Sequence, residues 1–208
     1  MKNLFPENNN YKLKEFLDSY SERLISSLKE LNVGDLESVY DSLLKAIKNK
    51  SMIYTCGNGG SAAIAEHLVC DFLKGASTDT NINPKLVPLL STPTITAIAN
   101  DMSYDDVFSY QLEKYASEGD VLLCVSSSGD SENIVRAINA AKKMKVETIS
   151  FVGFEGGRAK DLSDCCVHVN SNNYGICEDA HHSLMHIFAQ FLRLKNIDDS
   201  KKIGNVKF

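Results

Sequence analysis

The stretch Cys56-Gly-Asn-Gly-Gly-Ser61 decides the fold of this chain, because it joins a strand to a helix through three glycines. Residues 51–56 are predicted as a short buried strand, and residues 61–74 as a helix with apolar side chains at near-helical spacing. Glycines let the backbone approach a ligand closely, and the first amides of a helix lack partners within it. Although such turns also close ordinary strand–helix corners, the stretch indicates an anion-binding turn.

Strands and helices alternate through the rest of the chain. The run 121–125 is continuously apolar, as expected for a strand that is buried on both faces. Further strands are predicted at 85–90, 148–152 and 166–169, and further helices at 92–100, 105–117, 131–144 and 177–194. This alternation predicts an α/β fold with a mainly parallel sheet. Ligands of such sheets bind at the carboxyl ends of the strands.

Two amphipathic helices are predicted before the first strand, at 11–31 and 35–48, from apolar residues spaced three and four apart. A parallel sheet does not need them as crossover connections. They either cover a face of the sheet or pack against another subunit, and we prefer the second interpretation.

Composition narrows the class of protein. The 208 residues suit a single domain, and a formal net charge of −5 without a Lys/Arg stripe argues against a nucleic-acid partner. No apolar run approaches the length of a membrane span, and the N-terminal residues lack the apolar core of a signal peptide. The six cysteines show no CxxC spacing. We therefore expect a cytoplasmic protein with reduced thiols and no membrane partner.

A second polar turn, Ser126-Ser-Ser-Gly-Asp-Ser131, follows the strand at 121–125. Its four hydroxyls and free amides suit a phosphate group, although Ser and Asp are also preferred helix caps. Four hydroxyls exceed what one cap needs, which favours anion binding. Asp130 argues the other way, because a carboxylate would repel a phosphate unless it caps the helix or points away.

Acidic and imidazole side chains recur on two helices. His67 and Asp71 are four residues apart, and Glu178, His182 and His186 follow at intervals of four on the last helix. Each set therefore shares one helical face. Any one of these histidines alone is more simply explained as a hydrogen-bonded or exposed residue. As a group they suit a divalent transition metal or acid–base catalysis.

Together these motifs resemble the phosphoheptose isomerases, which are sugar-isomerase (SIS) enzymes that convert sedoheptulose 7-phosphate to D-glycero-D-manno-heptose 7-phosphate. The resemblance is carried by 57–61, His67 with Asp71, 99–101, 126–131 and Glu178 with His186, and runs from about residue 12 to 195. It implies one SIS domain over 1–208, built as a three-layer sandwich with an N-terminal helical hairpin. Residues 12–48 would serve oligomerisation, as in the family's homotetramers, and 195–208 would form a polar tail.

The resemblance also implies roles for individual residues. Asp71 is expected to act as the catalytic base and His186 as the acid, and a zinc ion is expected at His67, Asp71, Glu178 and His186. The substrate-binding residues it implies are Asn58, Gly59, Gly60, Ser61, Asn100, Asp101, Ser126, Ser127, Ser128, Ser131 and Glu178. The product would serve the heptose of bacterial lipopolysaccharide or capsule.

The chain departs from the family at three of these positions. The family usually has Glu at Asp71, Gln at Glu178 and Asn at Asp130. The shorter Asp71 leaves open whether Asp71 or Glu178 is the base, and His182 has no role implied by the resemblance. Two other functions stay open, namely a non-catalytic SIS protein that binds a sugar phosphate or a replication initiator, and a different sugar-phosphate isomerase.

Overall fold

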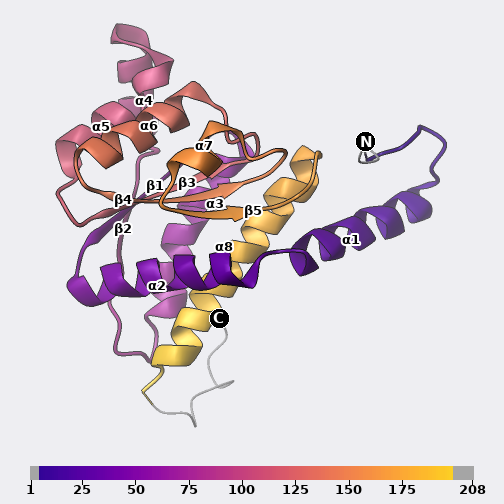
Figure 1. Cartoon of the computed structure of the whole chain (residues 1–208), viewed down its shortest axis with the longest axis horizontal. Helices are drawn as coiled ribbons and strands as arrows, with labels where there is room; N and C mark the ends of the chain where they lie inside the picture. The colour runs from indigo at the N-terminus through magenta and orange to yellow at the C-terminus, as the bar shows by residue number, and fades with distance from the viewer. Residues whose placement is uncertain (1–4, 199–208) are drawn as a thin grey trace.

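A five-stranded parallel sheet with the strand order β2-β1-β3-β4-β5 forms the middle layer of the computed structural model, which describes residues 5–198 (Figure 1). Every residue of β3 is buried, and β1 and β4 are partly exposed only at their first residue. The predicted parallel α/β fold is confirmed. The strands are β1 (Met52–Gly57), β2 (Lys85–Pro88), β3 (Val121–Ser126), β4 (Glu147–Val152) and β5 (Cys165–His168).

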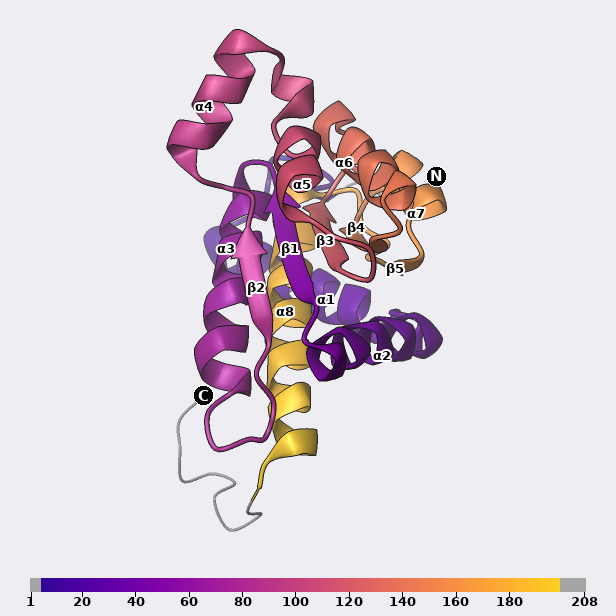
Figure 2. The same cartoon turned by 90° about the vertical axis from the view of Figure 1, so that its left-hand side faces the viewer.

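Helices cover both faces of the sheet, as Figures 1 and 2 show. One face carries α2 (Val33–Asn49), α3 (Gly60–Cys70) and α8 (Tyr174–Asn196). The other carries α5 (Ser109–Tyr115), α6 (Glu132–Lys143) and α7 (Gly157–Leu162). Between β2 and α5 the chain forms α4 (Thr92–Asp101) and the 3₁₀ helix η2 (Tyr104–Asp106). No helix within residues 5–198 has the length and apolar character needed to cross a bilayer.

The strand order places the two polar turns side by side. β1 and β3 are hydrogen-bonded neighbours, with Gly57 opposite Val125. After β1 the chain leaves toward β2, whereas after β3 it leaves toward β4 on the other side. This is the point at which doubly wound sheets bind their ligands, because neither connection covers the crevice between the strand ends.

The two N-terminal helices do not form the expected hairpin. α1 (Leu13–Lys29) and α2 follow one another roughly end to end, and α1 extends beyond the three layers (Figure 1). Their apolar stripes have different partners, which explains the arrangement. Val39 and Leu43 of α2 are buried in the sheet core, whereas α1 packs against α8 through contacts that include the Tyr20 hydroxyl. The alternative that these helices cover the sheet therefore holds for α2.

Three local predictions differ from the structure. The helix predicted over 61–74 remains α-helical only to Cys70, and the π-helix η1 (Asp71–Ala76) continues it. No helix was predicted between the strands at 148–152 and 166–169, where the structure has the short helix α7, which has too few residues to show periodicity. The predicted polar tail is helical up to Asn196, and residues 199–208 lie outside the described part of the chain.

Candidate active site

The turn after β1 is packed against the last helix. A Cβ added at Gly60 would lie 2.4 Å from Oε2 of Glu178, so only glycine leaves room for that carboxylate. Glu178 therefore sits directly at the glycine turn. A cavity of about 260 Å³ opens beside the turn, and its lining includes Asn58, Glu66 and Tyr104.

Asn58 is held by two residues that the sequence did not point to. Its side-chain amide exchanges a reciprocal pair of hydrogen bonds with the amide of Asn133, at 2.9 and 3.0 Å. The Tyr104 hydroxyl donates a further hydrogen bond to Asn58 Oδ1 at 2.8 Å. Asn133 is buried on α6 and Tyr104 begins η2, so three segments fix one side chain. No sequence spacing connects them, because the hydrogen bonds depend on how α6 and η2 pack together near the turn after β1.

Two of the four hydroxyls of the serine turn are engaged within it, since the N–H of Gly129 donates to Ser126 Oγ at 3.2 Å and the N–H of Asp130 donates to Ser128 Oγ at 3.3 Å. Ser126 and Ser127 are buried, and Ser127 Oγ has no hydrogen-bond partner among the described residues. A buried hydroxyl without a partner is costly unless a ligand satisfies it. Ser131 occupies the N-cap position of α6, yet its side chain makes no capping hydrogen bond. The capping alternative therefore does not account for the hydroxyls of Ser127 and Ser131.

Asp130 is neutralised by a guanidinium. Arg158, at the start of α7, donates from Nε to the Asp130 carboxylate and from Nη2 to the Asp130 carbonyl oxygen at 2.9 Å. A second nitrogen of Arg158, Nη1, reaches Glu132 at 2.8 Å. The hydrogen bond from Arg158 lowers the pKa of Asp130. The negative charge of Asp130, which would oppose an anion in this turn, is therefore paired with Arg158. This residue lies on α7, the helix that the sequence did not predict.

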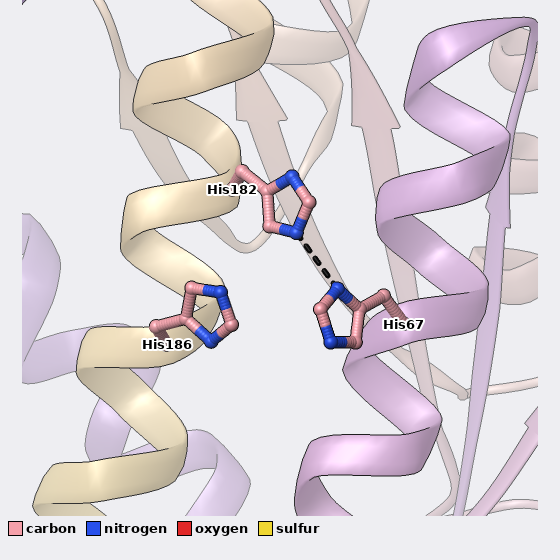
Figure 3. A group of neighbouring side chains, drawn as sticks. All are labelled: His67, His182 and His186. Carbon is pink, nitrogen blue, oxygen red and sulfur yellow. Dashed lines mark hydrogen bonds between the residues drawn. The ribbon is translucent and has the colours of Figure 1, made fainter.

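Three histidines meet between α3 and α8 (Figure 3). His67, His182 and His186 each offer one ring nitrogen, and these three atoms lie within 4.8 Å of one another. His67 Nδ1 and His182 Nε2 are 2.8 Å apart. The structure thus brings His182, to which the resemblance assigned no role, into the same group as His67 and His186.

Asp71 lies beside this group. Its Oδ2 is 2.7 Å from His186 Nδ1, and its Oδ1 is 3.4 Å from His67 Nε2. The Asp71 side chain is only 15% exposed, so these contacts are partly shielded from solvent. Asp71 is also the first residue of the π-helix, a wider turn that often marks functional sites.

Other predicted site residues lie elsewhere. Glu178 is against Gly60 rather than in the three-histidine group. Asn100 and Asp101 are exposed at the end of α4 and hydrogen-bond to each other at 2.7 Å. The residues of α4 that line the cavity beside the glycine turn are Thr92 and Ile95, and not Asn100 or Asp101.

His181, next in sequence to the cluster, points into the core. It is fully buried beside Phe151, and burial lowers its pKa to about 4. The imidazole is therefore neutral at ordinary pH. His181 is therefore a packing residue, whereas His182 and His186 of the same helix belong to the three-histidine group. Only the tertiary structure shows this difference.

Comparison with known proteins agrees with this geometry. Residues 15–153 match the family described as SIS domain. A phosphoheptose isomerase of Nitratiruptor sp. is 38% identical over 72% of this chain and 80% of its own length. One of Clostridium acetobutylicum is 32% identical over 84% of this chain and 92% of its own length. The structure of a phosphoheptose isomerase from Neisseria gonorrhoeae superposes with a TM-score of 0.79 and 27% identity, covering 87% of this chain and 98% of that one.

Proposed function

Because the chain belongs to the phosphoheptose isomerases of the SIS-domain family, we propose that it converts sedoheptulose 7-phosphate to D-glycero-D-manno-heptose 7-phosphate. The observation that carries the proposal is that the serine turn lies beside the glycine turn and its cavity at one edge of the sheet, while α3 leads from the glycine turn to the acid–imidazole group between α3 and α8. The product suits the heptose of bacterial lipopolysaccharide or capsule.

The phosphate group is assigned to the turn Ser126–Ser131. The unpartnered Ser127 hydroxyl and the uncommitted Ser131 side chain support this, together with the amides that begin α6. The pairing of Asp130 with Arg158 removes the main electrostatic objection. The sugar would then extend along the glycine turn toward Asn58 and Glu178.

The reaction moves a proton between C1 and C2 through an enediol. A carboxylate must take the proton from carbon while an acid protonates or stabilises the developing oxyanion. Asp71 is the proposed base and His186 the proposed acid, supported by the 2.7 Å contact between them. An ionised carboxylate has about four lone-pair sites. Asp71 can therefore accept hydrogen bonds from the imidazoles and still use another lone pair to take a proton from the substrate. Glu178, at the glycine turn, is the alternative base.

The imidazoles of this site suit a divalent transition metal such as zinc. When bound, such an ion supplies Lewis acidity to the carbonyl and hydroxyl oxygens of the sugar. The protein's own groups bind the phosphate, orient the sugar and transfer the proton.

We expect the purified protein to convert sedoheptulose 7-phosphate into the aldose and to exchange a carbon-bound proton with solvent. Following the reaction by NMR in deuterated water measures both events, and ribose 5-phosphate serves as a control for substrate length. Tight binding of sedoheptulose 7-phosphate with neither turnover nor exchange would contradict the proposal and favour a sugar-phosphate-responsive regulator.

We also expect a homo-oligomer larger than a dimer, assembled through α1. Three apolar side chains of this helix are conspicuously exposed: Leu13 (85%), Leu17 (56%) and Ile25 (52%). α1 extends beyond the layers, and burying its uncovered apolar face against another subunit would stabilise an assembly.

Sedimentation velocity at micromolar concentration tests the expected oligomer. The double variant Leu13→Asp/Leu17→Asp should dissociate the assembly, whereas Lys29→Glu at the polar end should not. A monomeric wild type would contradict it.

A further inference from the structure

We propose that the metal site of this chain consists of three imidazoles, from His67, His182 and His186, with Asp71 behind them and Glu178 outside the site. This deepens the proposed function and rests on it for the role of the metal, but metal binding can be measured without turnover. It replaces the ligand set His67, Asp71, Glu178 and His186 that the family resemblance implies. While an ion is bound, His186 would serve as a ligand and not as the acid, because both of its ring nitrogens would then be committed.

The three ring nitrogens are already close enough to share an ion. They lie within 4.8 Å of one another, and the closest pair, His67 Nδ1 and His182 Nε2, is 2.8 Å apart. Two nitrogens bound to one tetrahedral zinc at 2.0–2.1 Å are about 3.3 Å apart. The pair therefore needs to open by only about half an ångström for an ion to enter. All three side chains are partly exposed, so the ion can reach them.

Asp71 is placed to orient two of the ligands. One carboxylate oxygen faces His186 Nδ1 and the other faces His67 Nε2. If each of these nitrogens carries its proton, His186 presents the lone pair of Nε2 and His67 that of Nδ1. A carboxylate behind a metal-bound imidazole fixes the ring and raises its basicity. The shorter side chain of Asp71, compared with the family's Glu, suits this position behind the rings.

Glu178 lies against a different part of the chain. Its carboxylate packs against the glycine turn, with Oε2 2.4 Å from the point that a Cβ of residue 60 would occupy. His182 lies one helical turn further along α8, toward His186, and occupies the face that meets His67. A set of three imidazole ligands leaves a fourth position open for water or substrate, which is the ligand count of catalytic zinc sites.

The test compares His182→Leu with Glu178→Gln, two neighbouring changes on one helix. Zinc affinity is measured by competition with a chromophoric chelator, and circular dichroism checks that each variant is folded. We expect His182→Leu to weaken zinc at least ~10²-fold, because the loss of an outer partner alone costs about 10–100-fold. Glu178→Gln should change the affinity by less than about threefold, since its carboxylate lies outside the ligand set. The opposite pattern, or a wild type that binds no zinc, would overturn the proposal.

Histidine NMR gives a second readout that does not depend on mutation. In zinc-loaded protein labelled with ¹⁵N-histidine, metal-bound and protonated nitrogens are distinguished by chemical shift. We expect His67 to bind through Nδ1, and His182 and His186 through Nε2. A His182 ring that does not respond to zinc would contradict the proposal even if the enzyme were fully active. Conversely, a three-imidazole site in a protein without isomerase activity would refute only the proposed function.

Discussion

Replacing Asp71 with Asn is expected to lower turnover of sedoheptulose 7-phosphate at least ~10²-fold, the low end for losing a general base. The amide keeps the size of the side chain but removes its charge and its ability to take a proton. It also leaves one of the two facing imidazole nitrogens, on His67 or His186, without an acceptor. The affinity for sugar phosphate should fall far less, because the phosphate contacts are assigned to Ser126–Ser131.

The matched control for this change is Glu178→Gln, which installs the residue usual in the family. Steady-state kinetics should show the loss at Asp71 in kcat rather than in KM, and zinc added in excess separates a catalytic loss from poor metal loading. Near-normal turnover in Asp71→Asn together with a large loss in Glu178→Gln would assign the base to Glu178 and reject the role proposed for Asp71.

Replacing Gly129 with Ala is expected to disable the serine turn and destabilise the protein. Gly129 has a φ of +64°, and an added Cβ would lie 1.9 Å from the carbonyl oxygen of Gly156. That neighbour is backbone, so it cannot rotate away, and the turn must separate from the start of α7. Strain at positive φ and forced overpacking together cost about 2–5 kcal/mol. The separation would also displace the hydroxyls of Ser127 and Ser131 from the proposed phosphate site.

Gly119→Ala provides the matched control, because Gly119 has a φ of +90° but nothing lies within 4 Å of an added Cβ. Denaturant unfolding should therefore show a smaller loss of stability in Gly119→Ala, which has the conformational strain without the clash. Calorimetric titration with sedoheptulose 7-phosphate should show normal affinity in that variant and loss of binding in Gly129→Ala. Equal stability and equal affinity in the two variants would show that the turn does not depend on its contact with α7.

The sequence by itself determined the layers of the fold and the position of the two polar turns that form part of the candidate site. The apolar run at 121–125 and the glycine turn after residue 56 are local signals, because strand burial and helix starts depend on neighbouring residues. Both turns were therefore placed correctly at strand ends, and parallel strands bring such ends to one edge. The pairing of His67 with Asp71 followed in the same way from helical spacing.

Only the tertiary structure decided which of these side chains meet across elements. Helical spacing placed Glu178, His182 and His186 on one face, but the depth at which α8 crosses α3 sets His182 against His67 and Glu178 against Gly60. Packing between α7 and the serine turn supplies Arg158 to Asp130. The whole fold likewise determines what an apolar helix face packs against. The apolar face of α2 is buried against the sheet, whereas several apolar side chains of α1 remain exposed. Periodicity identifies the face that a helix buries, and the contacts made by distant segments determine what lies opposite it.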